Sequence, residues 1–264
     1  MFANLQRLTR HRTLIQTMVV RELKARYRGS FLGYFWSLLN PLLLLLVYTV
    51  VFTYIIKAKF GQVDNYPLFL FCGILPWTWF SSSLMESSTV IISGGGLLKK
   101  ILFPAEVLPV VAVLANLVHF LLALPVLLAC MIFFGVYPGL HTLWFFPVVL
   151  IQFFFTMGLA LLISSLSVHF RDLKDILANL LTLWFFASPV IYPYSFVADL
   201  PPFLRVALEI NPMTHLMMGY QGAFLFPGEI HVQRLAAMAL LALLVFALGY
   251  WVFDRLRDTL VEEV

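Results

Sequence analysis

The sequence predicts an all-α integral membrane protein with six transmembrane helices in one domain and both termini in the cytoplasm. The chain of 264 residues is 62% hydrophobic and only 11% charged, whereas soluble domains carry about 25% charged residues. Its apolar residues gather in six stretches, and a helix needs about 20 of them to cross a bilayer. Its Lys and Arg residues concentrate in alternate segments between these stretches, which indicates the orientation.

The first 30 residues predict an amphipathic helix on the cytoplasmic face of the membrane. Apolar side chains recur there at helical spacing: Leu14, Ile15, Met18, Val19 and Leu23. Basic side chains are available for the opposite side: Arg12, Arg21, Lys24 and Arg28. Such a helix can lie flat on lipid headgroups without a partner, or it can offer a docking surface to a soluble cytoplasmic subunit.

The first two spans are expected over residues 31–56 and 67–92. Trp36 stands near the start of the first span, at the level expected for lipid headgroups. This stretch is 26 residues long, well beyond the roughly 7 to 15 apolar residues of a signal peptide, so we expect it to remain as a membrane anchor.

The loop between spans two and three, residues 93–109, is rich in glycine but predicts no nucleotide site. A P-loop requires the pattern G-x-x-x-x-G-K-[ST], and Gly94 is followed five residues later by Lys99 rather than Gly. The loop instead predicts a glycine hinge and a short amphipathic segment that carries Lys99 and Lys100 and ends near Pro104.

Spans three and four are expected over residues 107–136 and 143–168. Asn116 and His119 lie one helical turn apart, so they can share a face and hydrogen-bond to a neighbouring helix. Glu86, in span two, lies near the inner face and is expected to be solvated. A proton relay would need further carboxylates at the depth of Asn116, and their absence disfavours a proton-coupled pump.

Span five, residues 176–191, is shorter and is broken by prolines. The following residues 195–233 are too apolar for an ordinary loop, and their helical stretches 203–210 and 213–226 are too short to cross the bilayer. We expect a pair of half-helices that re-enter the outer leaflet under the shelter of other protein segments.

The distribution of basic residues places both termini in the cytoplasm. A sixth span, expected over residues 235–253, gives an even number of crossings. With the N-terminus inside, the inner segments hold 13 of the 17 Lys and Arg residues and the outer segments hold four, as the positive-inside rule requires.

The sequence argues against catalysis, metal binding and nucleic-acid binding. Cys72 and Cys130 lie inside apolar stretches, where they are expected to be small buried hydrophobes. The six His residues are scattered, and no Ser-His-Asp set is evident. The net charge is +4, but seven of the 17 basic residues precede Phe31, where they face anionic headgroups more simply than nucleic acid.

Three tryptophans, Trp77, Trp79 and Trp184, are expected near the middle of the membrane rather than at headgroup level. They can stack on the CH-rich faces of sugar rings along a translocation path. They can equally pack against other helices or lipid, and these residues alone leave both interpretations open.

Six stretches, taken in order, cover essentially the whole chain. They are RYRGSFLGYFWSLLNPLL (residues 26–43), GILPWTWFSSSL (73–84), KKILFPAEVLP (99–109), FRDLKDI (170–176), SPVIYP (188–193) and NPMTHLMMGYQ (211–221). Together they resemble the permease subunit of type 2 ABC (ABC-2) exporters for polysaccharides, the family of O-antigen, capsule and teichoic-acid permeases.

The resemblance implies a homodimer in the bacterial inner membrane, working with two copies of a separate ATPase subunit that binds Mg-ATP. It implies export of a lipid-linked polysaccharide, O-antigen first among them, from cytoplasm to periplasm through a channel at the dimer interface. No cofactor is expected in this chain, and its partners are the ATPase, the glycan and membrane lipids, with no nucleic acid.

The resemblance also assigns residues to three roles. The surface coupled to the ATPase would comprise Arg26, Tyr27, Arg28, Lys99, Lys100, Phe103, Pro104, Glu106, Arg171 and Asp172. The translocation path would comprise Trp36, Trp77, Trp79, Trp184 and Phe185. The outer gate would comprise Pro189, Tyr192, Pro193, Tyr194, Asn211 and Pro212.

Other functions fit the residues less well. A teichoic-acid or capsule exporter belongs to the same family, and a drug or small-molecule exporter of the same architecture differs only in its substrate. A membrane-embedded glycan or lipid transferase would need acid and base residues clustered at one depth, and the sequence offers no such cluster.

Overall fold

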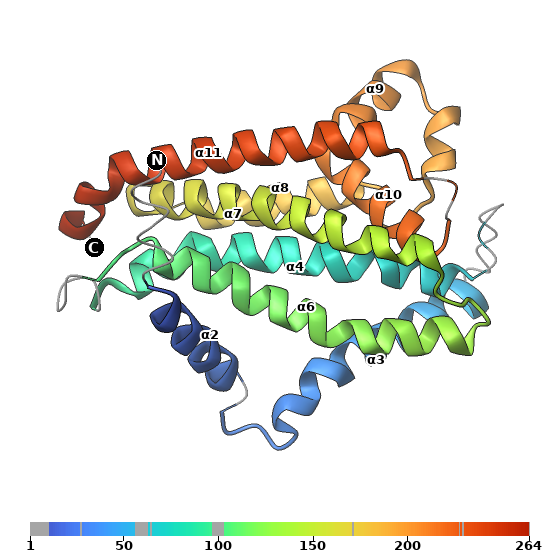
Figure 1. The fold of residues 1–264 in the computed structure, drawn as a ribbon, viewed down its shortest axis with the longest axis horizontal. Coiled ribbons are helices and arrows are strands. Elements are labelled where there is room, and N and C mark those ends of the chain that lie inside the picture. Colours follow the sequence, from blue (N-terminus) through green and yellow to red (C-terminus); the bar gives the residue numbers. More distant parts are fainter. Residues whose placement is uncertain are drawn as a thin grey trace.

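The computed structural model describes residues 11–26, 28–55, 63, 65–96, 103–170, 172–226, 228 and 230–263, and this part of the chain contains helices and turns but no strand. Figure 1 shows a bundle of long helices with short helices at its ends. In chain order the elements are α2 (Arg12–Arg26), η1 (Gly33–Phe35), α3 (Trp36–Thr49), η2 (Val50–Ile55), α4 (Tyr66–Ser93), α6 (Val107–Phe133), η3 (Leu140–Trp144), α7 (Phe145–His169), α8 (Leu173–Phe186), η4 (Tyr194–Asp199), α9 (Pro202–Ile210), α10 (Pro212–Phe224) and α11 (Val232–Glu263).

Among the described residues, four helical segments are long and apolar enough to cross a membrane. They are Tyr66–Ser93, Val107–Phe133, Leu140–His169 and Val232–Arg257. They coincide with the second, third, fourth and sixth expected spans. A shorter apolar helix, Leu39–Phe52, lies within the first expected span, and α8 covers most of the fifth with 14 residues. The number of six crossings and the orientation of the termini stay predictions.

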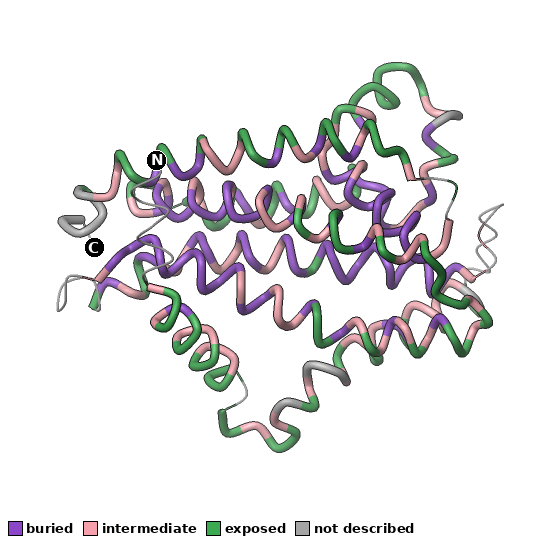
Figure 2. The backbone as a smooth tube through the Cα atoms, viewed as in Figure 1, coloured by how far each residue is buried: buried purple, intermediate pink, exposed green. Residues whose placement is uncertain are grey.

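Helix α4 is the centre of the bundle. It packs against α3, α6, α7, α8 and α10, and 78% of its most apolar window is buried, against 28% for α11. Figure 2 shows α4 as almost continuously buried. A helix that is apolar on every side is stable only when other helices surround it or when it faces lipid. Helix α4 is surrounded by other helices.

Helices α7 and α11 cross with their backbones in direct contact. A Cβ atom added to Gly249 would lie 2.0 Å from the carbonyl oxygen of Gly158, and one added to Gly158 would lie 2.6 Å from the Cα atom of Phe246. Small residues allow helices in membranes to approach this closely. The opposite side of α11 exposes leucines, among them Leu240 and Leu244.

The chain bends sharply between α2 and α3. Gly29 and Gly33 adopt positive φ angles of 79° and 50°, a conformation that glycine adopts without a steric penalty. Residues 31–32 are therefore not helical, and the helix expected from Phe31 begins at Trp36 instead. In Figure 1, α2 and α3 descend from the two ends of the bundle and meet at this corner.

The two short helices α9 and α10 lie at the end of the bundle opposite the C-terminal end of α11 (Figure 1). They occupy positions where two half-helices were expected, and their entry into the outer leaflet stays a prediction. Helix α10 is almost entirely buried and packs on α4, α7 and α11. Helix α9 contacts chiefly η4 and α10 and exposes most of its residues.

Candidate functional site

Arg26, the last residue of α2, joins three helices through its guanidinium group. Its Nη1 atom donates a hydrogen bond to Asn116 Oδ1 of α6 at 3.1 Å, and its Nη2 atom forms an ion pair with Glu86 of α4. Asn116 Nδ2 in turn donates to Glu86 Oε2 at 2.8 Å. The sequence predicted the bond from Asn116 to a neighbouring helix. Glu86, expected to be solvated, keeps 37% of its side chain exposed and also forms the ion pair with Arg26.

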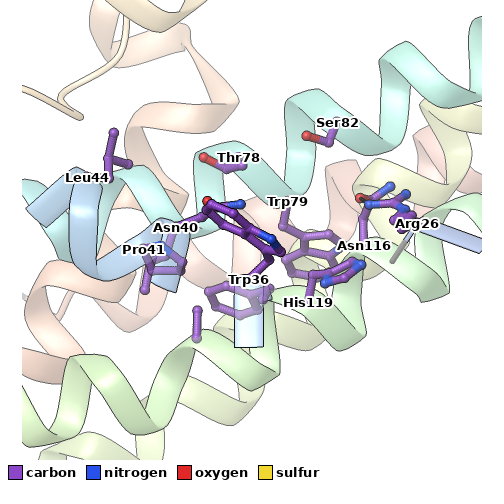
Figure 3. Close-up of a pocket in the computed structure, with 13 residues that line it drawn as sticks. Arg26, Trp36, Asn40, Pro41, Leu44, Thr78, Trp79, Ser82, Asn116 and His119 are labelled. Atoms are coloured by element: carbon purple, nitrogen blue, oxygen red, sulfur yellow. Dashed lines mark hydrogen bonds between the residues drawn. The ribbon is translucent and has the colours of Figure 1, made fainter. Parts of the chain in front are cut away.

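Two cavities lie on either side of this Arg26–Glu86–Asn116 triad. The first, of about 340 Å³, lies between α3, α4 and α6, and its lining includes Trp36, Asn40, Thr78, Trp79, Ser82 and His119. Figure 3 shows Arg26 and Asn116 at one end of it and Pro41 and Leu44 at the other. The second, of about 290 Å³, lies between α2 and the bundle and includes Arg21, Glu22 and Glu86. The triad borders both cavities: Arg26 and Asn116 line the first, and Glu86 lines the second.

The residues expected to couple to the ATPase differ in their exposure. Arg28 and Asp172 are exposed, so they are available to a soluble partner. Pro104 and Glu106 are buried, and Glu106 Oε2 lies 3.9 Å from Arg257 Nε of α11. Phe103 packs partly buried against the core. Tyr27, Lys99, Lys100 and Arg171 lie outside the described residues.

The aromatic residues expected along the translocation path separate into different environments. Trp36 and Trp79 line the first cavity. Trp77 and Phe185, whose ring centroids are 5.5 Å apart, line another cavity of about 320 Å³ between α4 and α8. Residues two apart on a helix point to nearly opposite sides, so Trp77 and Trp79 cannot share one face of α4. Trp184 lines neither of these two cavities and packs against Phe80 and Phe155.

The residues expected at the outer gate gather around the turn after α8. This turn, Ala187 to Pro193, connects α8 to η4, and its residues Ser188, Pro189, Val190 and Pro193 are buried. Asn211 caps the N-terminus of α10 by accepting a hydrogen bond from Met213 N at 3.0 Å, and Pro212 occupies the first position of α10.

Of the two tyrosines of the gate set, Tyr192 lies within the turn and Tyr194 follows it directly. Tyr192 donates a hydrogen bond from its hydroxyl to the Phe186 carbonyl at 3.2 Å. Tyr194 accepts one from Arg234 Nη1 at 3.5 Å, with the guanidinium carbon 5.6 Å from the ring centroid. The structure thus groups the six gate residues in one region, although it does not test their role in transport.

Sequence reasoning missed three polar side chains that bind backbone carbonyls of other segments, two of them in the turn after α8. Gln221 Nε2 donates to the Pro189 carbonyl at 2.8 Å, Tyr66 donates to the Ile191 carbonyl, and Gln152 Nε2 donates to the Pro76 carbonyl at 2.9 Å. A polar residue inside an apolar helix usually hydrogen-bonds to another segment, and that signal was present at Gln152 and Gln221.

Comparison with known families identifies the architecture. The family model described as "ABC-2 type transporter" matches residues 13–225, from α2 through α10. The chain belongs to the ABC-2 type transporters. With its four membrane-length helices, it is a multi-pass membrane protein.

This ABC-2 transporter is similar along nearly its whole length to curated proteins. It is 41% identical to the O-antigen export system permease protein RfbA of Myxococcus xanthus over 97% of both chains. It is 30% identical to a protein of the same name from Klebsiella pneumoniae over 94% of both, and 25% identical to the polysialic acid transport protein KpsM of Escherichia coli over 77% of this chain and 78% of that protein.

The family match of this ABC-2 transporter covers both the Arg26–Glu86–Asn116 triad and the gate region. Within the described residues, no three His, Cys, Asp or Glu side chains gather closely enough to hold a metal ion. The arrangement offers polar links between helices and cavities lined by aromatic side chains.

Proposed function

We propose that this protein is the transmembrane subunit of an ATP-driven exporter that moves a lipid-linked polysaccharide, O-antigen, from the cytoplasm to the periplasm across the bacterial inner membrane. The observation that carries the proposal is the 41% identity, over 97% of the chain, to a protein named as an O-antigen export permease. The weaker likeness to a polysialic acid transport protein makes a capsule polysaccharide the second candidate substrate.

A separate ATPase supplies the energy in this proposal. The sequence contains no P-loop at its glycine-rich segment, so ATP with its Mg²⁺ would bind to a partner subunit. The partner would rest on the exposed side of α2 and on the turn before α8, where Arg28 and Asp172 are exposed.

The triad supplies a physical route from the partner to the bundle. Arg26 holds the end of α2 to Glu86 of α4 and Asn116 of α6, so a displacement of α2 would be transmitted to two membrane helices. Glu106 and Arg257 offer a second link, between the loop before α6 and the C-terminal part of α11.

The channel in this proposal forms between two copies of the chain. Helices α3 and α8 expose apolar side chains, among them Leu46, Leu180 and Leu183. The cavity lined by Trp77, Thr182 and Phe185 lies between α4 and α8. A second copy packed against α8 would place two such cavities beside one another, and the aromatic rings would offer sugar faces a surface without directional demands.

The test is deletion of the gene in its source bacterium, followed by complementation. We expect lipid-linked glycan to accumulate on the cytoplasmic side and surface polysaccharide to disappear, with both effects reversed by the intact gene. The permease should also copurify with an ABC ATPase. Normal surface polysaccharide in the deletion strain would overturn the proposed function, and loss of capsule with O-antigen intact would select the second candidate.

A further inference from the structure

The turn from Ala187 to Pro193 is buried although its backbone is irregular. Ser188 and Val190 have no exposed surface, and the turn lies at the end of the bundle that carries α9 and α10 (Figure 1). Irregular backbone at membrane depth requires hydrogen-bond partners from other protein segments. The question is which side chains hold this turn, and to which helices they tie it.

Asn211 uses the full hydrogen-bonding capacity of its amide at this turn. Its Oδ1 atom accepts from Trp184 Nε1 at 2.8 Å and from Met213 N at 3.0 Å. Its Nδ2 atom donates to the Ala187 carbonyl at 2.7 Å and to Ser188 Oγ at 3.0 Å. A primary amide can accept two hydrogen bonds and donate two, so Asn211 fastens the end of α8, the turn and the start of α10 to one another.

Trp184 is fixed on both its apolar and its polar side. Its ring meets Phe80 of α4 edge-on, with centroids 5.2 Å apart and planes at 88°, and it meets Phe155 of α7 at 6.4 Å. Its indole N–H group donates a hydrogen bond to Asn211, and Ser188 Oγ donates one to the Trp184 carbonyl at 2.8 Å. A ring held in this way is poorly placed to slide along a sugar chain.

Side chains and backbone from α4 and α10 also contact the turn, beside its own hydrogen bonds to α8. Gln221 of α10 donates to the Pro189 carbonyl and Tyr66 of α4 to the Ile191 carbonyl. Gly73 of α4 lies so close that a Cβ atom there would be 2.9 Å from the Val190 carbonyl oxygen. These contacts hold the turn against α4 and α10. The side-chain hydrogen bond from Trp184 to Asn211 makes the position of the turn depend also on the position of α8.

We infer that Trp184 and Asn211 form a latch that holds the turn closed until α8 moves relative to α10. Trp184 is then a positioning residue and not a contact for the glycan, contrary to its expected place in the translocation path. The inference rests on the proposed function, because a closed gate has a role only in an exporter. When α8 shifts, the indole N–H leaves Asn211, and α8 loses its side-chain link to the start of α10.

The experiment measures the accessibility of the turn in the purified permease–ATPase complex without nucleotide. Cys72 and Cys130 are replaced by alanine and Val190→Cys is introduced as a reporter. The reporter's reaction rate with a charged, water-soluble maleimide is compared in Trp184→Phe, which keeps a ring but lacks the N–H donor, and in Asn211→Ala. Trp77→Phe, which makes the same exchange beside Phe80 and Phe185, is the matched control.

We expect Trp184→Phe to raise the labelling rate by roughly fivefold, the effect of one lost buried hydrogen bond. Asn211→Ala removes that bond and three others of the same amide, so it should raise the rate by at least as much. The double variant should label no faster than Asn211→Ala alone, because both changes remove the same link. Trp77→Phe should label as the parent does. Equal rates in Trp184→Phe and the parent, or equal increases in both tryptophan variants, would overturn the latch.

A further variant keeps the test decisive if Asn211→Ala fails to assemble. Gly73→Ala pushes on Val190 from α4 while removing no hydrogen bond, and its labelling rate should also rise. The labelling rate does not depend on the substrate, so the latch and the proposed function can each be disproved without the other. Increased labelling in the variants, together with normal surface polysaccharide in the deletion strain, would overturn only the proposed function. Unchanged labelling in Trp184→Phe, together with lost export in that variant, would overturn only the latch.

Discussion

Arg26, a residue expected at the ATPase-coupling surface, directs its guanidinium group to two membrane helices. Its guanidinium lies between Glu86 and Asn116, and Glu22, one turn earlier on α2, is a weaker partner at 4.0 Å. The side chain of Glu86 is 37% exposed, so solvent screens part of its attraction to Arg26. The triad therefore matters more as a link between three helices than as a contribution to stability.

We predict that Glu86→Gln reduces export by roughly tenfold, while the free energy of unfolding falls by only about 1 kcal/mol. The neutral amide keeps the size of the side chain but no longer holds the charge of Arg26. Surface polysaccharide in the complemented deletion strain and ATPase activity of the purified complex are the measurements. ATPase activity should persist, because the ATPase is intact and only its link to α4 is lost.

Glu22→Gln is the control for this prediction, since it removes the more distant partner of Arg26 and should leave export nearly unchanged. The exchanged pair Arg26→Glu with Glu86→Arg should recover part of the lost export. Equal losses in Glu22→Gln and Glu86→Gln would show that surface charge, rather than the triad, controls export.

The contact of Arg26 with Glu22 was predictable from the sequence and the other two contacts were not. Glu22 and Arg26 are four residues apart, which places them on one face of a helix. Glu86 and Asn116 are 60 and 90 residues away from Arg26, and only the packing of α2 against the bundle brings them together. The same limit applies to the bond between Trp184 and Asn211, 27 residues apart.

At the scale of elements, long apolar helices were predictable and their interruptions were less so. Composition alone indicates α4, α6, α7 and α11, because a bilayer selects for length and hydrophobicity. The late start of α3 depends on the positive φ angle of Gly33. A glycine in the sequence permits such an angle but does not require it. The opposite directions of Trp77 and Trp79 follow from helical geometry and were available from the sequence.

The crossing of α7 and α11 leads to a second prediction. Gly249→Ala should destabilise the protein by about 1 to 3 kcal/mol, the usual cost of overpacking, because its Cβ atom would meet the Gly158 carbonyl oxygen at 2.0 Å. Gly228→Ala, at a position with open space around it, is the matched control. Thermal unfolding in detergent measures both, and equal melting temperatures would contradict the close crossing.

At the scale of the whole molecule, exposed apolar surface has two explanations. Helix α11 exposes Leu243 and α8 exposes Leu183, 51% and 72% respectively. Lipid is as apolar as a leucine side chain, so neither composition nor periodicity separates a lipid-facing helix from one that faces another subunit. The segment Val232–Arg257 of α11 is long enough to cross a bilayer. Helix α8 has only 14 residues, so its exposed apolar side chains are better covered by a protein neighbour.

The last prediction asks which face a second copy covers. In a two-fold dimer each residue near the axis meets its own counterpart, and a disulfide requires Cα atoms within about 7 Å. With Cys72 and Cys130 replaced by alanine, Leu183→Cys should therefore give a covalent dimer on oxidation in native membranes, measured on a non-reducing gel. Leu243→Cys on α11 should stay monomeric on the same gel. Dimers from Leu243→Cys with none from Leu183→Cys would move the interface to α11 and leave the cavity beside Trp77 facing lipid, where it could not contribute to a shared channel.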